Sequence, residues 1–446
     1  MFLRLDILAF YTYHQGALKQ GNAMRKSILN PLLFPLFLTI TYGGYILLRV
    51  RHIMKIREPR QFYDTVEFME IASRPVTSPT FWAGIKPPVT ALLFKLCDSD
   101  PVRIMFAQAW ISIIAWGVLA LVLALIIRNF WLKPVVFVTV LSFSLVQNVI
   151  LWDSLVISES ISISLMAIFL AAAFWLLEKW EWYRFALLAV SAFLLANTRD
   201  TYAYFLLMAG VLVLILLFFS TQRIRILLVS GLFFALFLMV SVLSAVGMRY
   251  VVPFLMTTGM RILPNEEYVA YFEKRGMPIT PALMERSGKP IQADENMLFD
   301  PDLEDYRQWV VDNGRSEYLR FLWFFKADTL QNPIRDAEWV LNPDLYYYAA
   351  TGYRPIISSM RLNELLYSFR FGLAMSLFAN LLAAALVIPA IQQRNPLWMI
   401  PIGLILLSYP QAVLVWNADA KEIARHSVSH VLMLRLGFTK RSSESR

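Results

Sequence analysis

Asp64 is the first candidate for chemistry, because the surrounding sequence places this acidic residue at a membrane–water boundary. It follows an apolar span over residues 28–50 and precedes another that begins near Ile104. A carboxylate held there can reach a lipid headgroup and a water-soluble partner together. Asp64 could act as a general base that removes a proton from an acceptor hydroxyl. Alternatively, it could only cap a short helix, a position that suits Asp.

Glu159 and Asp153 are two further acidic candidates, beside or within a predicted span over residues 155–177. An ionisable group inside a membrane helix is costly, which favours a functional role for Glu159. The alternative for Glu159 is a structural bond to a neighbouring helix, since the serines around it favour close packing. Asp153 lies nearer the boundary and could bind substrate or be a solvated turn residue.

Arg199 and Lys86 supply positive charge at similar depth. Arg199 stands between two spans in Asn197-Thr198-Arg199-Asp200, and its guanidinium could clamp a phosphate with two hydrogen bonds. An ion pair with a neighbouring acid is the alternative. Lys86 precedes a rigid Pro-Pro pair and could contact substrate, or be an interfacial lysine whose ammonium reaches toward water.

Arg425 and His426 complete the set of candidates. Together with Glu422, their i, i+3, i+4 spacing places them on one face of a helix. Both could bind an anionic headgroup, or they could belong to an interfacial anchor. The chain has only four histidines and shows no metal-ligand spacing. The sequence leaves open whether a divalent metal is needed, because Asp64, Asp153 and Glu159 could meet at one site.

The composition is that of a membrane protein. Of the 446 residues, 58% are hydrophobic, 14% are aromatic and only 16% are charged, against about 25% charged residues in soluble domains. The single cysteine, Cys97, excludes an intramolecular disulfide. The net charge of +9 arises from basic residues that flank apolar spans, which indicates a membrane surface and not nucleic acid. No nucleotide-binding motif is present, so we expect no nucleotide cofactor.

We therefore predict an all-α polytopic membrane protein with about nine or ten transmembrane helices. Spans of roughly 20 apolar residues fit a bilayer. The predicted spans are 28–50, 104–127, 135–152, 155–177, 185–198, 201–219, 226–247, 369–391 and 397–416, with a weaker tenth at 427–438. Basic residues in short loops place Asp64 and the long loop 248–368 outside, in a multi-pass plasma-membrane protein of the bacterial inner-membrane kind.

The chain then divides into five segments. Residues 1–27 form a cytoplasmic N-terminal segment, and 28–247 form a transmembrane catalytic module. The module includes an external loop, 51–103, whose helical spacing and prolines predict two short amphipathic helices on the membrane. Residues 248–368 form a small external helical cap. The C-terminal helices occupy 369–438, and 439–446 form a cytoplasmic tail.

These features resemble the GT-C superfamily of integral-membrane glycosyltransferases. The nearest likeness is to the protein O-mannosyltransferase and lipid A aminoarabinose transferase branch and its uncharacterised bacterial relatives. The resemblance covers most of the chain outside 248–368. The residues that carry it are Tyr63-Asp64, Trp82 to Pro88, Ser158-Glu159-Ser160, Thr198-Arg199, and Asp419, Glu422, Arg425 and His426.

The resemblance implies transfer of a sugar from a polyprenyl-phosphate donor at the external face. Asp64 then matches the first-loop catalytic acid of the family, and Arg199, Lys86 and Arg425 match basic positions near the donor phosphate. The sequence departs from the mannosyltransferase pattern because Thr65, and not Glu, follows Asp64. It also lacks the WWDYG motif of oligosaccharyltransferases. Protein mannosylation and N-glycosylation are therefore not supported as specific activities.

We expect a glycosyltransferase that inverts the anomeric carbon by direct displacement, with Asp64 as base and Glu159 positioning the acceptor or the base. The leaving phosphate departs as an anion and needs cations, not a general acid. Membrane lipids and an unidentified glycan, lipid or protein acceptor are the expected partners, without nucleic acid. An O-antigen ligase or polymerase is one alternative, and a lipid flippase or transporter, which should tolerate Asp64→Asn, is another.

Overall fold

A computed structural model describes residues 33–127, 129–218, 220–291, 300–336, 348–354, 356, 399–418, 420, 423 and 425–426. The chain divides into two compact units, Met1–Thr41 and Tyr42–Arg446. The described part of the first unit is the beginning of helix α2 (Leu33–Ile53), which continues into the second. Every regular element in the described ranges is helical, and the single isolated β-bridge joins Arg60 to Leu155. The predicted all-α class is confirmed for these residues.

Four helices of the described chain are long and apolar enough to cross a membrane, which identifies a membrane protein. They are α6 (Pro101–Ile126), α9 (Ser158–Glu178), α11 with its 3₁₀ extension η2 (Asp200–Phe218) and α12 (Arg223–Val246). Each coincides with a predicted span. Shorter apolar helices in the described chain are α7 (Leu132–Phe143), α10 (Trp182–Ala196), Val251–Ile262, and Ile402–Ala418 within α23 (Met399–Ala418). The predicted spans 369–391 and 427–438 lie outside the described residues.

The prediction of one continuous span over 135–152 is wrong. Helix α7 ends at Phe143, and the short helices α8 (Gln147–Ile150) and η1 (Leu151–Ser154) follow. Ser144 lies at the break, where its hydroxyl donates to Leu141 O at 2.7 Å. A serine that bonds to a nearby carbonyl in this way competes with helix continuation.

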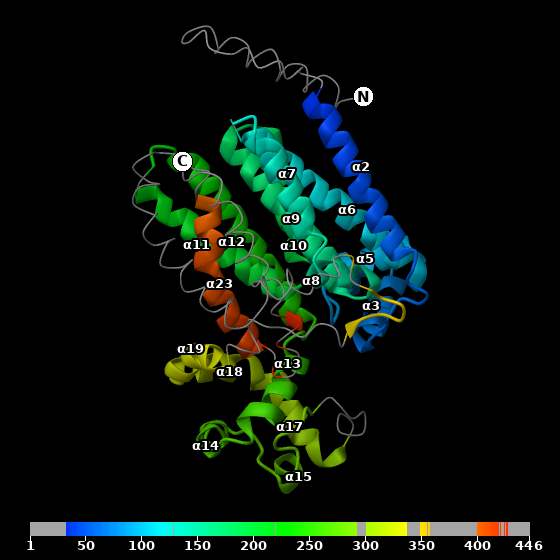
Figure 1. The fold of residues 1–446 in the computed structure, drawn as a ribbon. Helices are drawn as coiled ribbons and strands as arrows, with labels where there is room; N and C mark the ends of the chain where they lie inside the picture. Colours follow the sequence, from blue (N-terminus) through cyan, green and yellow to red (C-terminus); the bar gives the residue numbers. More distant parts are fainter. Residues whose placement is uncertain are drawn as a thin grey trace. The chain divides into compact units, whose positions relative to one another are not determined.

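The apolar helices from α6 to α12 (α6, α7, α9, α10, α11 and α12) run alternately in opposite directions, as Figure 1 shows. Helix α6 packs against α7 and α9, α9 against α10, and α11 against both α12 and α23. Figure 1 shows that the C-terminal ends of α7, α10 and α12 therefore lie at the same end of the bundle as the N-termini of α6, α9 and α11. Loops far apart in sequence are thereby brought to one end.

The loop between α2 and α6 is helical, but it holds three helices where the sequence predicted two amphipathic ones. It contains α3 (Tyr63–Ser73), α4 (Pro79–Trp82) and α5 (Pro88–Leu96). Prolines at the first turns of α4 and α5 suit helix starts, where the missing N–H is not needed. Phe68, Ile71, Phe81 and Phe94 are almost fully buried among these helices. The loop therefore has its own apolar core and holds its polar residues in fixed positions.

A helical cap follows α12. Its elements are α13 (Val251–Thr257), η3 (Thr258–Ile262), α14 (Glu266–Glu273), α15 (Pro281–Met284), η4 (Pro301–Leu303), α17 (Glu304–Trp309), η5 (Val310–Gly314), α18 (Arg315–Phe324) and α19 (Lys326–Arg335). Phe254, Phe272, Tyr306 and Phe321 belong to its aromatic core. The cap lies at the end of the bundle where α9 and α11 begin (Figure 1).

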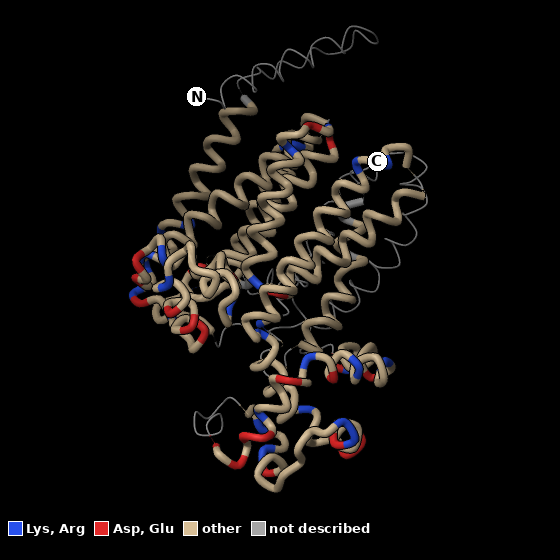
Figure 2. Tube along the Cα trace, turned by 180° about the vertical axis from the view of Figure 1, so that it is seen from behind, with Lys and Arg blue, Asp and Glu red and all other residues tan. Residues whose placement is uncertain are grey.

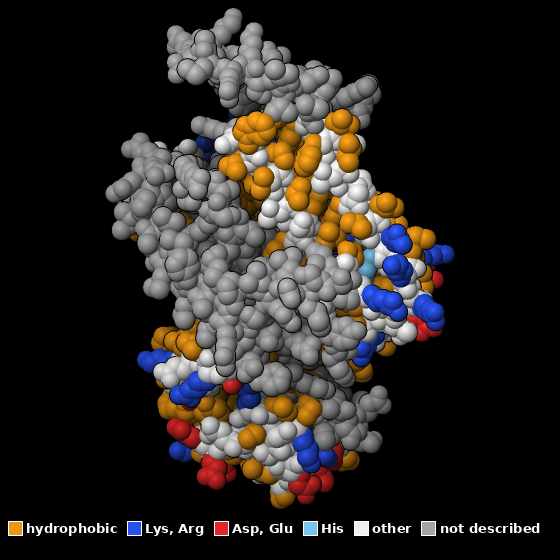
Figure 3. Space-filling view, viewed as in Figure 1, with side chains coloured by type: hydrophobic (Ala, Val, Ile, Leu, Met, Phe, Trp, Pro, Cys, Tyr) orange, Lys and Arg blue, Asp and Glu red, His pale blue; other side chains and the backbone are white. Residues whose placement is uncertain are grey.

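Charged residues are distributed unevenly over the second unit. Figure 2 shows Lys, Arg, Asp and Glu concentrated in the α3–α5 loop, the cap and the helix ends, while the middle of the long helices carries few. In the face drawn in Figure 3, the described side chains over the helical bundle are mainly hydrophobic. This pattern is expected of helices that face lipid with polar groups at the boundary.

Candidate active site

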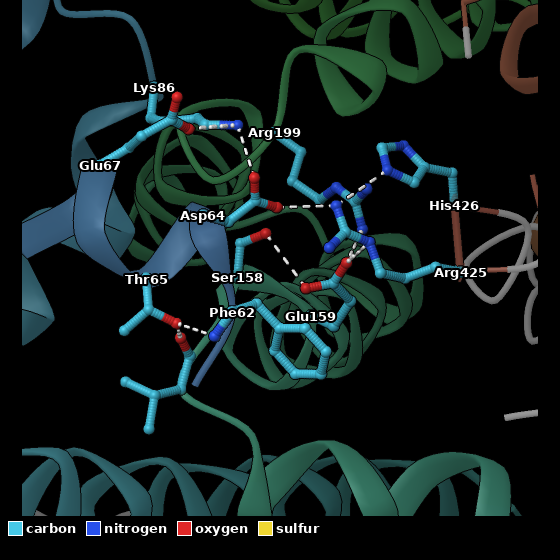
Figure 4. Close-up of polar contacts among 11 residues, drawn as sticks. Phe62, Asp64, Thr65, Glu67, Lys86, Ser158, Glu159, Arg199, Arg425 and His426 are labelled. Atoms are coloured by element: carbon cyan, nitrogen blue, oxygen red, sulfur yellow. Dashed lines mark hydrogen bonds and ion pairs between the residues drawn. The ribbon is translucent and has the colours of Figure 1, made fainter. Parts of the chain in front are cut away.

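Asp64 lies in the first turn of α3, and both of its carboxylate oxygens accept from basic side chains. Lys86 Nζ is 2.9 Å from Oδ1, and Arg425 Nη2 is 2.7 Å from Oδ2. The N-cap of α3 is Phe62, so Asp64 is not the cap residue. Figure 4 shows the carboxylate between the two cations, which come from the turn before α5 and from the segment after α23.

Glu159 extends the same network on the other side of Arg425. Its Oε1 atom is 3.1 Å from Arg199 Nη1 and 3.1 Å from Arg425 Nε. Arg425 thus bridges two carboxylates from separate helices, as Figure 4 shows. His426 Nε2 lies 3.2 Å from Arg425 Nη2. We call Asp64, Glu67, Lys86, Glu159, Arg199 and Arg425 the ionic cluster.

The side chains of the ionic cluster range from buried to partly exposed. The side chain of Glu159 is 2% exposed and that of Arg425 is 6%, whereas Asp64 is 20% and Lys86 25% exposed. A ligand can therefore approach from the side of Asp64 and Lys86. Glu159, which is more buried, accepts a charge-assisted hydrogen bond from Arg199 and forms an ion pair with Arg425.

Short backbone contacts hold Asp64 against the start of α9. Arg60 N donates to Ser154 O and Val156 N donates to Arg60 O, at 3.1 and 3.0 Å. Thr65 Oγ1 accepts from Phe62 N and donates to Val156 O at 2.6 Å. Because α9 begins two residues after Val156, these bonds fix the first turn of α3 beside Glu159. Thr65 therefore helps to position the first turn of α3.

Arg249 and Gly247 hold the turn that carries Lys86. Arg249 donates to Gly84 O at 2.8 Å and to Trp82 O at 2.9 Å, and it forms an ion pair with Asp200 at 2.9 Å. A Cβ atom on Gly247 would lie only 2.3 Å from Gly84 O. Only glycine allows this approach of two backbones. The end of α12 thus fixes the position of Lys86.

The electrostatic environment separates the pKa values of two neighbouring carboxyls. Burial alone would raise the pKa of Asp64, but the positive charges of Arg425 and Lys86 outweigh it and hold that pKa well below its usual range. Burial raises the pKa of Glu67, with Lys86 opposing. The pKa of Lys86 is raised, since Asp64 and Glu67 together outweigh its burial. At neutral pH Asp64 is therefore a firmly ionised and weakly basic carboxylate.

Asp153 is not part of the ionic cluster. It forms a buried ion pair with Arg49, and its other oxygen accepts from Ser160 Oγ at 2.7 Å. Arg49 also donates to Ser112 Oγ at 2.7 Å. The prediction that Asp153 binds substrate is therefore not supported, because its side chain is 3% exposed and its bonds lie within the protein. No group of three or more His, Cys, Asp or Glu side chains suited to a metal ion occurs among the described residues, so Asp153 does not join Asp64 and Glu159.

Sequence reasoning brought five of the residues together correctly and missed one. Asp64, Lys86, Glu159, Arg199 and Arg425 all lie in the cluster, with His426 at its edge. Glu67 was missed, although it pairs with Lys86 at 2.9 Å. Its i+3 spacing from Asp64 places both acids on one helical face, which could have revealed it. Asp419 and Glu422 lie outside the described residues.

No family model matches this sequence, and no curated protein matches it either.

Proposed function

We propose that the protein is a glycosyltransferase that uses a polyprenyl-phosphate-linked sugar donor, with its active site at the ionic cluster. One observation carries the proposal. Asp64, a partly accessible carboxylate, lies between Lys86 and Arg425 at the end of the bundle where the α3–α5 loop meets the start of α9. A base and several cations at one membrane-proximal point are what displacement of a lipid phosphate requires.

The proposed step is a direct displacement at the anomeric carbon. The acceptor hydroxyl oxygen forms the new bond to this carbon, and its proton passes to Asp64. The bond between the anomeric carbon and the phosphate oxygen breaks, and its electron pair stays on the phosphate. The added negative charge on the leaving polyprenyl phosphate is then balanced by Lys86, Arg199 and Arg425. The configuration at the anomeric carbon is inverted.

Because the pKa of Asp64 is low, binding of the donor would also make Asp64 a better base. An ideal general base has a pKa near the working pH, and Asp64 has a much lower one while both cations hold it. A donor phosphate that takes Lys86 or Arg425 as its own partner removes that positive charge from Asp64. The pKa of Asp64 then rises, and the carboxylate becomes a better base only when the donor is present.

The ends of two long helices favour an anion at the same point. Glu159 lies in the first turn of α9, and Arg199 is the N-cap residue of α11. Helix N-termini carry partial positive charge that stabilises phosphate. Three acids and three bases make the ionic cluster neutral at pH 7, so a phosphate is accommodated by exchange of partners and by these helix ends.

The test uses the full-length protein in proteoliposomes with farnesyl-phosphoryl hexoses as donors and a panel of methyl hexosides as acceptors. Asp64→Asn should reduce product formation by about 10²–10⁴-fold, while farnesyl phosphate still binds. Asp98→Asn is the matched control in the same loop, because Asp98 is exposed and pairs only with exposed Arg103 in the described contacts. Normal turnover by Asp64→Asn, or movement of intact donor across the bilayer without transfer, would overturn the proposal in favour of a transporter.

A further inference from the structure

A cavity lies in the cap, apart from the ionic cluster. Its volume is about 370 Å³, and it is lined by residues of η3, α14, α18 and α19 together with the end of α23. Small-ligand pockets usually occupy about 300–1,000 Å³. The cavity is therefore large enough for a compact polar molecule such as one or two sugar rings.

The lining combines aromatic rings with hydrogen-bonding groups in fixed positions. Tyr268 donates its hydroxyl to Asp328 Oδ2 at 2.9 Å, and Trp416 donates its indole N–H to Asp336 Oδ2 at 2.8 Å. Arg261 covers the ring of Trp416, with 3.6 Å between its Cζ atom and the ring centre. An ionised carboxylate offers about four acceptor positions, so Asp328 and Asp336 can accept further bonds from a ligand.

The charges of the lining favour a neutral ligand. Two carboxylates, Asp328 and Asp336, are matched by two guanidinium groups, Arg261 and Arg335. Such a balance leaves the lining without net formal charge. Fixed acceptors beside flat rings instead suit a ring with hydroxyl groups at its edge and C–H groups on its faces.

We propose that this cavity binds a sugar unit of the acceptor. Trp416 and Asn417 lie in the last turn of α23, nine and eight residues before Arg425 in the sequence, so the cavity and the ionic cluster draw on neighbouring parts of the chain. Asn417 is anchored in the cap, with its amide donating to Thr329 O at 3.2 Å, and Tyr318 donates to Asn417 O at 2.5 Å. That the bound sugar belongs to the acceptor rests on the proposed function, whereas the binding of a sugar in this cavity does not.

The experiment measures saturation transfer by NMR from the full-length protein in detergent to methyl glycosides of glucose, galactose, mannose and N-acetylglucosamine. At least one glycoside should bind, and Asp336→Asn or Asp328→Asn should weaken it by about tenfold, the usual cost of a bond to a charged group. Asp305→Asn is the matched control, since Asp305 is exposed on α17 and outside the cavity lining. It should bind like the parent protein.

Two further variants make the result decisive. Trp416→Phe keeps an aromatic ring but removes the N–H that holds Asp336, and it should weaken binding even if an Asp variant fails to fold. Asp64→Asn should reduce transfer by the same factor as above and leave sugar binding unchanged, which separates this inference from the proposed function. Absence of saturation transfer to every glycoside, equal binding by the cavity variants, or displacement of the sugar by inorganic phosphate would overturn it.

Discussion

Arg425 Nη2 lies 2.7 Å from Asp64 Oδ2, although the two residues are 361 positions apart in the sequence. The contact joins the segment after α23 to the loop between α2 and α6. Arg425 also contacts Glu159, so one guanidinium joins three segments of the fold. Arg425 therefore contributes both to the geometry of the cluster and, together with Lys86, to the low basicity of Asp64.

Arg425→Gln should reduce transfer by about 10²–10³-fold, the range found when one group that stabilises transition-state charge is lost. Arg425→Lys should recover only part of this loss, because an ammonium cannot present two nitrogens to two carboxylates. Initial rates of product formation at saturating donor test both. Arg103→Lys, at an exposed position, is the control for the conservative change. Full activity of Arg425→Lys would show that charge alone is needed.

Glu67→Gln should retain most of the turnover and weaken the donor affinity. Glu67 shares Lys86 with Asp64, at 2.9 Å from each carboxylate, so its loss leaves Lys86 less firmly placed for the phosphate. A rise in KM for the donor with little change in kcat is the expected kinetic result. If Glu67→Gln instead abolished turnover while Asp64→Asn did not, Glu67, whose pKa is raised by burial, would be the base.

The low pKa of Asp64 should make the stability of the fold depend on pH only at acidic pH. Because the folded-state pKa lies below the ordinary value of 3.8, the ion pairs of Asp64 stabilise the fold fully above that value. This contribution is lost as the pH falls through 3.8 toward the lower folded pKa. The difference in Tm between the parent protein and Asp64→Asn should stay constant from about pH 8 to 5 and shrink below about pH 4. A difference that grows in acid would contradict the assignment.

The fold was predictable where one physical signal dominates. Long apolar runs bounded by charges gave α6, α9, α11 and α12 at nearly the observed limits, since a helix of about 20 apolar residues is what a bilayer demands. The break after Phe143 was not predictable in this way. A hydropathy average does not detect a local hydrogen bond such as that of Ser144, which lies where the helix ends. Residues 135–152 were therefore predicted as one span.

The site was partly predictable, because acids and bases are costly beside a membrane and therefore informative. This rule selected Asp64, Glu159 and Arg199, which the structure brings into one ionic cluster. It does not say which partner each charge takes. Asp153 satisfies the same rule, yet it pairs with Arg49 inside the protein, and only tertiary packing decides between the two outcomes.

Asp153→Asn should destabilise the protein and leave the KM for substrate unchanged. Arg49 and Asp153 have side chains that are 1% and 3% exposed, and removing one partner of such a buried pair costs about 3–5 kcal/mol. Unfolding in mixed micelles should show this loss. Asp98→Asn, at an exposed site, should be neutral. A normal stability combined with a raised KM would restore Asp153 as a substrate contact.

Gly247→Ala should reduce activity, although Gly247 is distant in sequence from Asp64 and Lys86. Its added Cβ would lie 2.3 Å from Gly84 O and 2.8 Å from Ala83 O, so the turn that carries Lys86 must move. A misplacement of about 1 Å can cost about 10²-fold in rate. Gly231→Ala is the matched control, because nothing lies within 4 Å of a Cβ built there and alanine favours the helix. Transfer assays should show a strong loss for the first variant and none for the second; equal activities would mean that the turn before α5 does not position Lys86 for catalysis.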